Sequence, residues 1–196
     1  SQIMESWFMH VPGLQVVVPS TPVDAKGLFK TAVRSPDPVM FFEYKRIYTS
    51  KGEVPDGEYT IPIGQADIKR EGEDATVVAI GPMVQKSLDA AVALEDDGYD
   101  IEVVDPRSLS PLDVDTICAS VRKTGRAIVC GEDSTFAGAA SEIAAMISES
   151  CFSDLKAPVR RIGSPHVPMP FSSELVKHVV PEKSHVIDAV NQTMAA

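Results

Sequence analysis

The sequence predicts an α/β protein with a mostly parallel sheet. Three continuous apolar runs, at residues 76–80, 101–104 and 127–130, are separated by two segments with helical periodicity. Such runs are typical of strands that are buried on both faces of a parallel sheet, with the intervening helices as right-handed crossovers. This strand–helix–strand–helix–strand unit occupies residues 74–133, and the rest of the chain is arranged around it.

Local signals predict where the helices of this unit begin and end. Gly98 and Gly125 follow the two periodic segments and predict their C-terminal caps. Asp113 precedes the second segment and predicts its N-cap, because its carboxylate can accept a hydrogen bond from a first-turn amide. The apolar positions of the first helix include Val84, Leu88, Ala91, Val92 and Leu94.

A second strand–helix–strand unit precedes the first. Apolar runs at 14–18 and 39–43 predict strands, and the segment 23–33 predicts a helix capped by Thr21. Residues 44–73 are rich in charge, proline and glycine, and we interpret them as a linker with one short strand near 60–63. We therefore expect three parts, 1–50 as the end of one domain, 51–70 as a linker and 71–196 as a second domain.

The C-terminal part continues the α/β pattern. We expect a helix at 141–150, a strand at 159–162 and a terminal helix that starts near Lys183. Between the last two, the stretch 163–171 contains three prolines and cannot be regular structure, so it predicts a rigid surface loop.

Composition excludes several classes of protein. The chain has 196 residues, 44% of them hydrophobic, and a formal net charge of −10, which argues against nucleic-acid or membrane-surface partners. The three cysteines have no paired spacing and predict buried, reduced thiols rather than disulfides or a metal site. The sequence has no apolar run of about 18 residues, as a transmembrane helix would need.

Candidate binding residues follow the third strand. Glu132 and Asp133 come at the carboxyl end of that strand, where open α/β sheets bind ligands, but a helix cap or an ion pair is the commoner role. Gly138 stands at the start of a predicted helix, where it could help bind an anion, although small residues there more often permit close packing. His166 is the histidine best placed to face a cleft, with a solvent or interface position as the alternative.

The remaining motifs predict no reaction. The glycines do not form the GxGxxG fingerprint, no serine lies in a GxSxG context, and no histidine has metal-ligand spacing to another histidine or to a cysteine. Taken by themselves, the residues predict a fold and leave the chemistry open.

Three stretches together resemble one family. They are HVPGLQVVVPSTPVDAKGLFKTAVRSPDPVMFFE at 10–43, IEVVDPRSLSPLDVDTICASVRKTGRAIVCGED at 101–133 and LKAPVRRIGSPHVPMPF at 155–171. This pattern is similar to the β subunit of the thiamine-diphosphate-dependent E1 component of 2-oxo acid dehydrogenase complexes. The resemblance implies that 1–50 are the end of a pyrimidine-binding domain and that 71–196 are a domain of the transketolase C-terminal type.

The resemblance also implies which catalytic groups belong elsewhere. A family glutamate that activates the cofactor ring lies far upstream, and a family histidine immediately precedes a Ser-Gln pair that matches Ser1 and Gln2. We therefore expect that sequence is missing upstream and assign no catalytic residue. Thiamine diphosphate and Mg²⁺ are held mainly by the α subunit in the family, so we expect the chain alone to be inactive.

One site of the family falls within the chain. Many members bind a monovalent cation, usually K⁺, at a turn between helix and strand that corresponds to Ala32, Val33, Ser35 and Asp37. Carbonyl oxygens at a helix C-terminus suit such an ion. An ordinary helix-ending turn is the alternative interpretation.

The resemblance implies partners and a reaction. The partners are an E1α subunit, a second β subunit and the subunit-binding domain of the E2 acyltransferase, and the reaction is oxidative decarboxylation of a 2-oxo acid, or acetoin cleavage, with acyl transfer to lipoyl-E2. Pyruvate, branched-chain and acetoin specificity stay open. The alternatives are a non-catalytic assembly module that binds E1α or E2, and another transketolase-type enzyme. We expect a cytoplasmic or a mitochondrial-matrix location.

Overall fold

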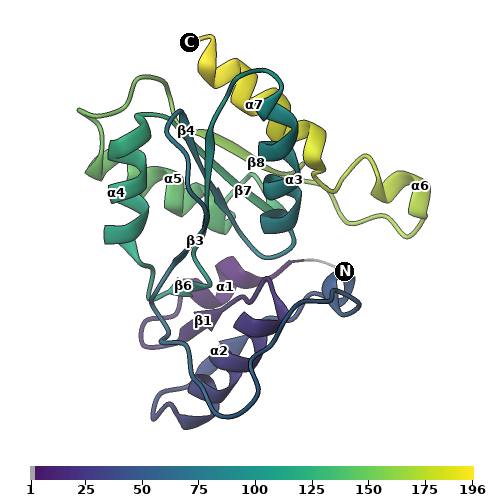
Figure 1. Ribbon diagram of the computed structural model, residues 1–196. Coiled ribbons are helices and arrows are strands. Elements are labelled where there is room, and N and C mark those ends of the chain that lie inside the picture. Colours follow the sequence, from purple (N-terminus) through teal and green to yellow (C-terminus); the bar gives the residue numbers. More distant parts are fainter. Residues whose placement is uncertain (1–2) are drawn as a thin grey trace.

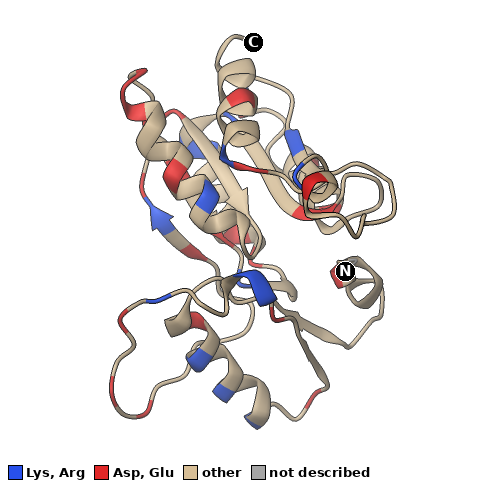
Figure 2. Ribbon diagram, turned by 90° about the vertical axis from the view of Figure 1, so that its right-hand side faces the viewer, with Lys and Arg blue, Asp and Glu red and all other residues tan. Residues whose placement is uncertain are grey.

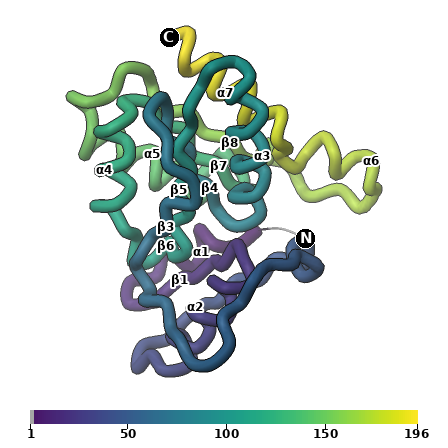
Figure 3. The backbone as a smooth tube through the Cα atoms, viewed as in Figure 1, coloured from purple at the N-terminus to yellow at the C-terminus, as the bar shows by residue number. Residues whose placement is uncertain are grey.

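The computed structural model describes residues 3–196 and consists of two α/β units, one stacked on the other (Figures 1 and 3). The larger unit contains a five-stranded sheet with helices on both faces, and the smaller one a three-stranded sheet. This arrangement confirms the predicted α/β class and the mostly parallel sheet.

The larger sheet has the strand order β3-β5-β4-β7-β8. Only the edge strand β3 is antiparallel; the other pairs are parallel, with Val77 of β4 opposite both Val103 of β5 and Ile128 of β7. The chain moves outward from β4 to β5, then returns past β4 to β7, so the topological switch point lies between β4 and β7. The bounds are β3 (Asp67–Arg70), β4 (Ala75–Ala79), β5 (Ile101–Asp105), β7 (Ala127–Ser134) and β8 (Arg160–Ser164).

Two apolar cores cover the two faces of this sheet. On one face Val77, Ala79 and Ile128 pack with α3 (Met83–Glu95) and α7 (Lys183–Met194). On the other, Val78 and Val129 pack with α4 (Val114–Thr124) and α5 (Ala139–Ser150). All residues of β4 and β5 are buried, as continuous apolar runs predict. Glu102 is the acidic interruption in β5; Lys123 of α4 pairs with it.

The smaller sheet has the order β2-β1-β6. Its strands β1 and β2 are parallel, whereas β6 comes from the larger unit and pairs antiparallel with β1, so the two units share a strand connection. The bounds are α1 (Glu5–Met9), β1 (Gln15–Val17), α2 (Pro22–Arg34), β2 (Val39–Phe41), the 3₁₀ helix η1 (Lys45–Ile47) and β6 (Ser108–Ser110).

The predicted helix caps are confirmed. Thr21 Oγ1 accepts from Asp24 N at 3.2 Å, and Asp113 Oδ1 accepts from Thr116 N at 3.1 Å. Gly125 (φ 75°) ends α4 in the left-handed conformation. Gly98 (φ 82°) ends α3 in the same way, because its N–H reaches the Glu95 carbonyl oxygen at 2.9 Å and the next amide reaches the Leu94 carbonyl oxygen at 3.0 Å, which is a Schellman pattern.

Three features of the structure were not expected from the sequence. The strand expected at 60–63 is absent. The strand of this region is β3 instead. Its charged residues were interpreted as part of a linker, because an edge strand tolerates Lys and Arg. Val92, one of the apolar positions of the helical pattern, is exposed, because the buried positions of α3 are 83, 84, 87, 90, 91 and 94 and residue 92 falls on the opposite side. The short helix α6 (Ser173–Val176), in an arm that extends from the larger unit, had no predictive pattern (Figure 1).

Candidate functional site

A cavity of about 850 Å³ lies where the carboxyl ends of β7 and β8 meet α1. Such strand ends are where open α/β sheets bind ligands. Its lining comes from three segments: the α1 segment (Ile3, Met4, Ser6, Trp7, His10), the end of β7 with the turn that follows it (Asp133, Ser134, Phe136, Ala137, Gly138) and the proline-rich loop (His166, Val167, Pro168).

The turn after β7 forms one wall, and its shape depends on Asp133 and Gly138. Asp133 Oδ2 accepts from Ala139 N at 2.5 Å, so this carboxylate caps the N-terminus of α5. A Cβ on Gly138 would overlap the Asp133 carboxylate and the Ser134 carbonyl oxygen, which explains why glycine stands there. The chain's own carboxylate thus occupies the helix N-terminus that could have bound an anion, and the close-packing interpretation of Gly138 is supported.

His166 stands at the rim of the cavity and is exposed. Its Nδ1 lies 3.3 Å from Ser134 Oγ, and its ring centroid lies 4.9 Å from that of Phe136. Both sequence interpretations of this histidine therefore hold, since it faces a cavity and contacts solvent. Within residues 3–196, no three His, Cys, Asp or Glu side chains converge as a metal site requires.

The switch point of the larger sheet is filled by the chain's own Tyr44. This residue is 8% exposed, and a Cβ on Gly81, at the end of β4, would lie 2.9 Å from its ring. The Tyr44 hydroxyl donates to Glu5 Oε1, so α1 is fixed at the same place. Sequence reasoning missed both residues, because Tyr44 stands in a segment that resembled a linker and Glu5 is a charged residue that carries no burial signal.

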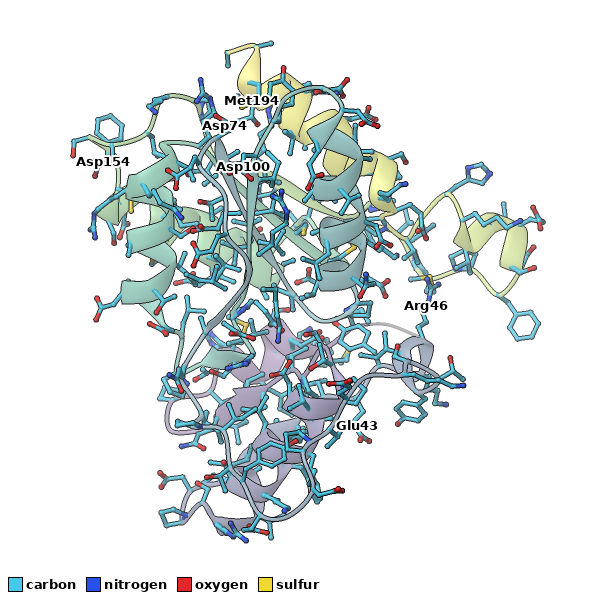
Figure 4. The ribbon with its side chains drawn as sticks, in the orientation of Figure 1. Glu43, Arg46, Asp74, Asp100, Asp154 and Met194 are labelled. Carbon is cyan, nitrogen blue, oxygen red and sulfur yellow. The ribbon has the colours of Figure 1, made fainter. Side chains whose placement is uncertain are left out.

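Glu132 lies near Tyr44 and is 5% exposed. Its Oε1 lies 3.2 Å from Lys86 Nζ of α3 and 3.8 Å from Arg46 of η1, which points from the smaller unit toward the larger one (Figure 4). The ion-pair interpretation of Glu132 is therefore correct, and the pair joins the two units.

A second network of ion pairs joins the units on another side. Lys69 Nζ of β3 lies 2.6 Å from Asp24 of α2, 2.7 Å from Asp67 and 3.8 Å from Asp105. Arg107 adds pairs to Asp24 at 2.9 Å and to Asp67 at 2.6 Å. Burial raises the pKa of Asp105 to about 6, against the lowering effect of the Ser20 hydrogen bond and the Lys69 charge. We call the five charged residues the interdomain ion network; they are Lys69, Arg107, Asp24, Asp67 and Asp105.

The four residues expected at a cation site lie together at the end of α2. Ser35 N donates to the Ala32 carbonyl oxygen at 3.2 Å, and Ser35 Oγ accepts from Asp37 N at 3.1 Å. Val33 and Asp37 are exposed. The set offers only oxygen ligands at a helix C-terminus, which is compatible with a weakly hydrated cation. None of these residues lines the cavity at α1.

The charges of the cavity decide what it can bind. Its lining contains one carboxylate, Asp133, and two histidines, but no lysine or arginine. A diphosphate needs cationic side chains or a metal ion, so these residues do not fit a diphosphate group by themselves. Elsewhere, most basic side chains are paired; Lys30 and Arg34 of α2, for example, both pair with Glu58. Acidic and basic residues are distributed over both units (Figure 2).

The rim of the cavity is aromatic and exposed. Trp7 is 70% and Phe136 68% exposed, and Val167 is half exposed beside them. Exposed aromatic side chains that gather around a cavity are typical of protein–protein contacts.

The described residues contain no helix that is both long and apolar enough to cross a membrane. The three cysteines are free and buried, as their count predicted.

Fold and site together define a two-unit α/β protein of the doubly wound type, in which Tyr44 fills the ligand crevice of the larger sheet. Residues 64–186 match the family of the transketolase C-terminal domain, and residues 1–51 match the family of the transketolase pyrimidine-binding domain. The chain belongs to the transketolase C-terminal domain family.

Curated relatives give the similarity in more detail. The chain is 44% identical to the acetoin:2,6-dichlorophenolindophenol oxidoreductase subunit beta of Cupriavidus necator, over 99% of the chain and 57% of that protein. It is 49% identical to the Bacillus subtilis 2-oxoisovalerate dehydrogenase subunit beta (93% and 57%) and 51% identical to the pyruvate dehydrogenase E1 component subunit beta of the same organism (86% and 52%). The chain thus spans little more than half the length of these relatives.

A solved structure supports the fold. A split gene transketolase, described as an inactive beta4 tetramer, superimposes with a TM-score of 0.82 at 26% identity, over 100% of this chain and 62% of that one. Because identity to the dehydrogenase subunits is much higher than to this transketolase, the E1β resemblance is favoured over another transketolase-type enzyme.

Proposed function

We propose that this chain is the C-terminal part of an E1β subunit. In the full complex it would take part in oxidative decarboxylation of a 2-oxo acid, or in acetoin cleavage, with acyl transfer to lipoyl-E2. The observation that carries the proposal is the identity of 44–51% to β subunits of three such enzymes over 86–99% of the chain. Those three differ in substrate, so the oxo acid stays open.

The cavity at α1 supports a division of labour between subunits. Its lining lacks lysine and arginine, so the diphosphate of thiamine diphosphate and its Mg²⁺ would be held by an E1α subunit. The exposed rim residues Trp7 and Phe136 would then be buried against that subunit. A second β subunit and the subunit-binding domain of E2 complete the proposed assembly, and the chain's charge of −10 suits a basic E2 domain.

We also propose a monovalent cation, K⁺, at Ala32, Val33, Ser35 and Asp37. The support is the oxygen-only ligand set at the C-terminus of α2, where the helix dipole is negative. We place the complex in the cytoplasm, because the relatives named above are bacterial and this chain's three cysteines are free and buried.

Reconstitution tests the proposed function. The chain, a family E1α subunit and the N-terminal half of a relative's β subunit are combined with thiamine diphosphate and Mg²⁺. Reduction of an artificial dye is then followed with pyruvate, 3-methyl-2-oxobutanoate or acetoin, in K⁺ and in Na⁺ buffers. We expect no turnover by the chain alone, turnover by the assembly with one preferred substrate, and a higher rate in K⁺.

A pair of matched variants makes this test specific for the rim. Trp7→Ser should weaken assembly at least tenfold in light scattering, because it removes an exposed aromatic anchor of about 1.4 kcal/mol or more. Phe152→Ser, which alters an equally exposed ring beyond the end of α5, should leave assembly unchanged. Turnover by the isolated chain, or equal effects of the two variants, would contradict the proposal.

The second candidate function is a non-catalytic assembly module. The position of Tyr44 favours this function, because a crevice that is filled by the chain's own side chain needs no ligand. A chain that binds E1α or E2 but yields no turnover in the complete mixture would support this reading.

A further inference from the structure

Glu5, Tyr44 and Asp133 form a buried cluster between α1 and the carboxyl end of the larger sheet. Glu5 is 2% and Asp133 6% exposed, and the Tyr44 hydroxyl donates to Glu5 Oε1. Glu5 Oε2 and Asp133 Oδ1 are both buried without a hydrogen-bond partner. We call these three residues the buried acidic cluster; they lie where α1 meets the larger unit.

Among the described residues, no cation forms an ion pair with a carboxylate of the buried acidic cluster. Glu132 of β7 takes both nearby cations, Lys86 of α3 at 3.2 Å and Arg46 of η1 at 3.8 Å. Lys86 is also shared with Glu182, which precedes α7, at 3.3 Å. Among the described residues, neither Glu5 nor Asp133 forms an ion pair. The groups nearest Glu5 are a neutral phenol and two further acids. Glu43, Lys45 and Arg46 line the same cavity as Glu5 but form no ion pair with it.

A carboxylate in such a place is unstable in its charged form. Burial without a cation disfavours ionisation, and neighbouring carboxylates add repulsion. Burial raises the pKa of Glu5 above its usual value, and the charges of Asp133 and Glu132 raise it further, whereas the Tyr44 hydrogen bond lowers it. Burial also raises the pKa of Asp133.

We propose that a proton on Glu5 fastens α1 to the larger sheet, and that α1 loosens when this proton leaves. The helix is five residues long and has no side-chain cap. Its other anchors are apolar, such as Phe8, whose ring centroid lies 5.6 Å from that of Phe42. α1 carries Ser6, Trp7 and part of the wall of the cavity, so the proton on Glu5 also controls the shape of that cavity.

The direction of the pH effect follows from linkage. The pKa of Glu5 is raised while α1 is seated and returns to an ordinary value when α1 is released. Seating therefore has its full stability below the ordinary pKa of about 4.5 and loses stability as the pH rises toward the raised value. α1 should therefore be held more firmly in acid than at higher pH.

The chain contains its own reporter, because its single tryptophan, Trp7, lies on α1. Fluorescence anisotropy of Trp7 is measured from pH 4 to 8.5, with far-ultraviolet circular dichroism as a check that the fold persists. We expect the anisotropy of the wild type to fall as the pH rises. Glu5→Gln, which is neutral at every pH and keeps the acceptor for Tyr44, should hold the acid-state anisotropy throughout. Glu53→Gln, an exposed control outside the cavity that Glu5 lines, should behave like the wild type.

A second variant keeps the test independent of how well Glu5→Gln folds. Tyr44→Phe leaves the ring against Gly81 but removes the hydroxyl that lowers the pKa of Glu5, so the transition should move to higher pH. Side-chain carbon NMR of Glu5 gives the titration directly. A wild-type anisotropy that is independent of pH, a transition unchanged in Glu5→Gln, or a Glu5 carboxyl that titrates at its ordinary value would overturn the proposal.

Discussion

Replacing Lys69 with Met is expected to lower the free energy of unfolding by about 3–5 kcal/mol, which is the usual cost of removing one partner from a buried ion pair. Lys69 is the ammonium group that Asp24, Asp67 and Asp105 share within the interdomain ion network. Asp24 and Asp105 are both 0% exposed. Without Lys69, Asp24 would keep Arg107 as an ion-pair partner, whereas Asp105 would lose its side-chain cation. The methionine side chain keeps the volume of the lysine stem and removes only the charge.

Urea unfolding of matched variants measures this effect. Lys177→Met, which breaks an exposed pair between residues three positions apart, should cost less than about 0.5 kcal/mol. Adding Asp24→Asn to Lys69→Met should restore part of the loss, because it removes one of the uncompensated carboxylates. The loss should also be smaller at pH 5 than at pH 8, since the pKa of Asp105 is about 6 and its carboxyl can take up a proton. A Lys69→Met loss no larger than that of Lys177→Met would refute the buried network.

Gly138→Ala is expected to lower the free energy of unfolding by about 3 kcal/mol and to deform the cavity at α1, as overpacking at a rigid site does. The new methyl group would overlap the Ser134 carbonyl oxygen and the Asp133 carboxylate. The first of these is a backbone atom of the last residue of β7, so no side-chain rotation can relieve the overlap. The cap that Asp133 provides for α5 would be lost together with the turn.

Gly52→Ala is the control for this substitution. Its added methyl group would meet Pro22 only at an ordinary 3.5 Å, and its backbone has no positive φ, so we expect a change within about 0.5 kcal/mol. Thermal unfolding of both variants, with amide exchange at Ala139 as the local readout, makes the comparison. Equal stability of the two variants would mean that the turn is not as tightly packed as described.

The strands of the larger sheet could be predicted because they are buried on both faces. A continuous run such as TVVAI at 76–80 has few alternatives in a globular chain. The caps at Thr21 and Asp113 could be predicted because they depend on contacts within three residues. β3 and β6 could not, since their pairing partners, β5 and β1, are distant in sequence and edge strands carry polar residues.

The candidate site was predictable only where strand ends define it. Glu132 and Asp133 were found because they lie at the carboxyl end of β7, and His166 because it follows β8 closely. Tyr44, Glu5 and Lys69 were missed, because their importance comes from burial between two units, and a charged residue in sequence gives no sign of being buried. The cation site at the end of α2 stays a prediction, since carbonyl ligands leave no signature in side chains.

Calorimetric titration of thiamine diphosphate with Mg²⁺ into the folded chain tests the central claim most directly. That claim is that these residues shape a subunit contact while the groups that hold the cofactor diphosphate lie on other chain segments. The cavity at α1 has no lysine or arginine in its lining, so we predict no heat of binding from a protein whose helix content is intact. Micromolar binding would contradict the account, because a complete diphosphate site would then have to exist within these 196 residues.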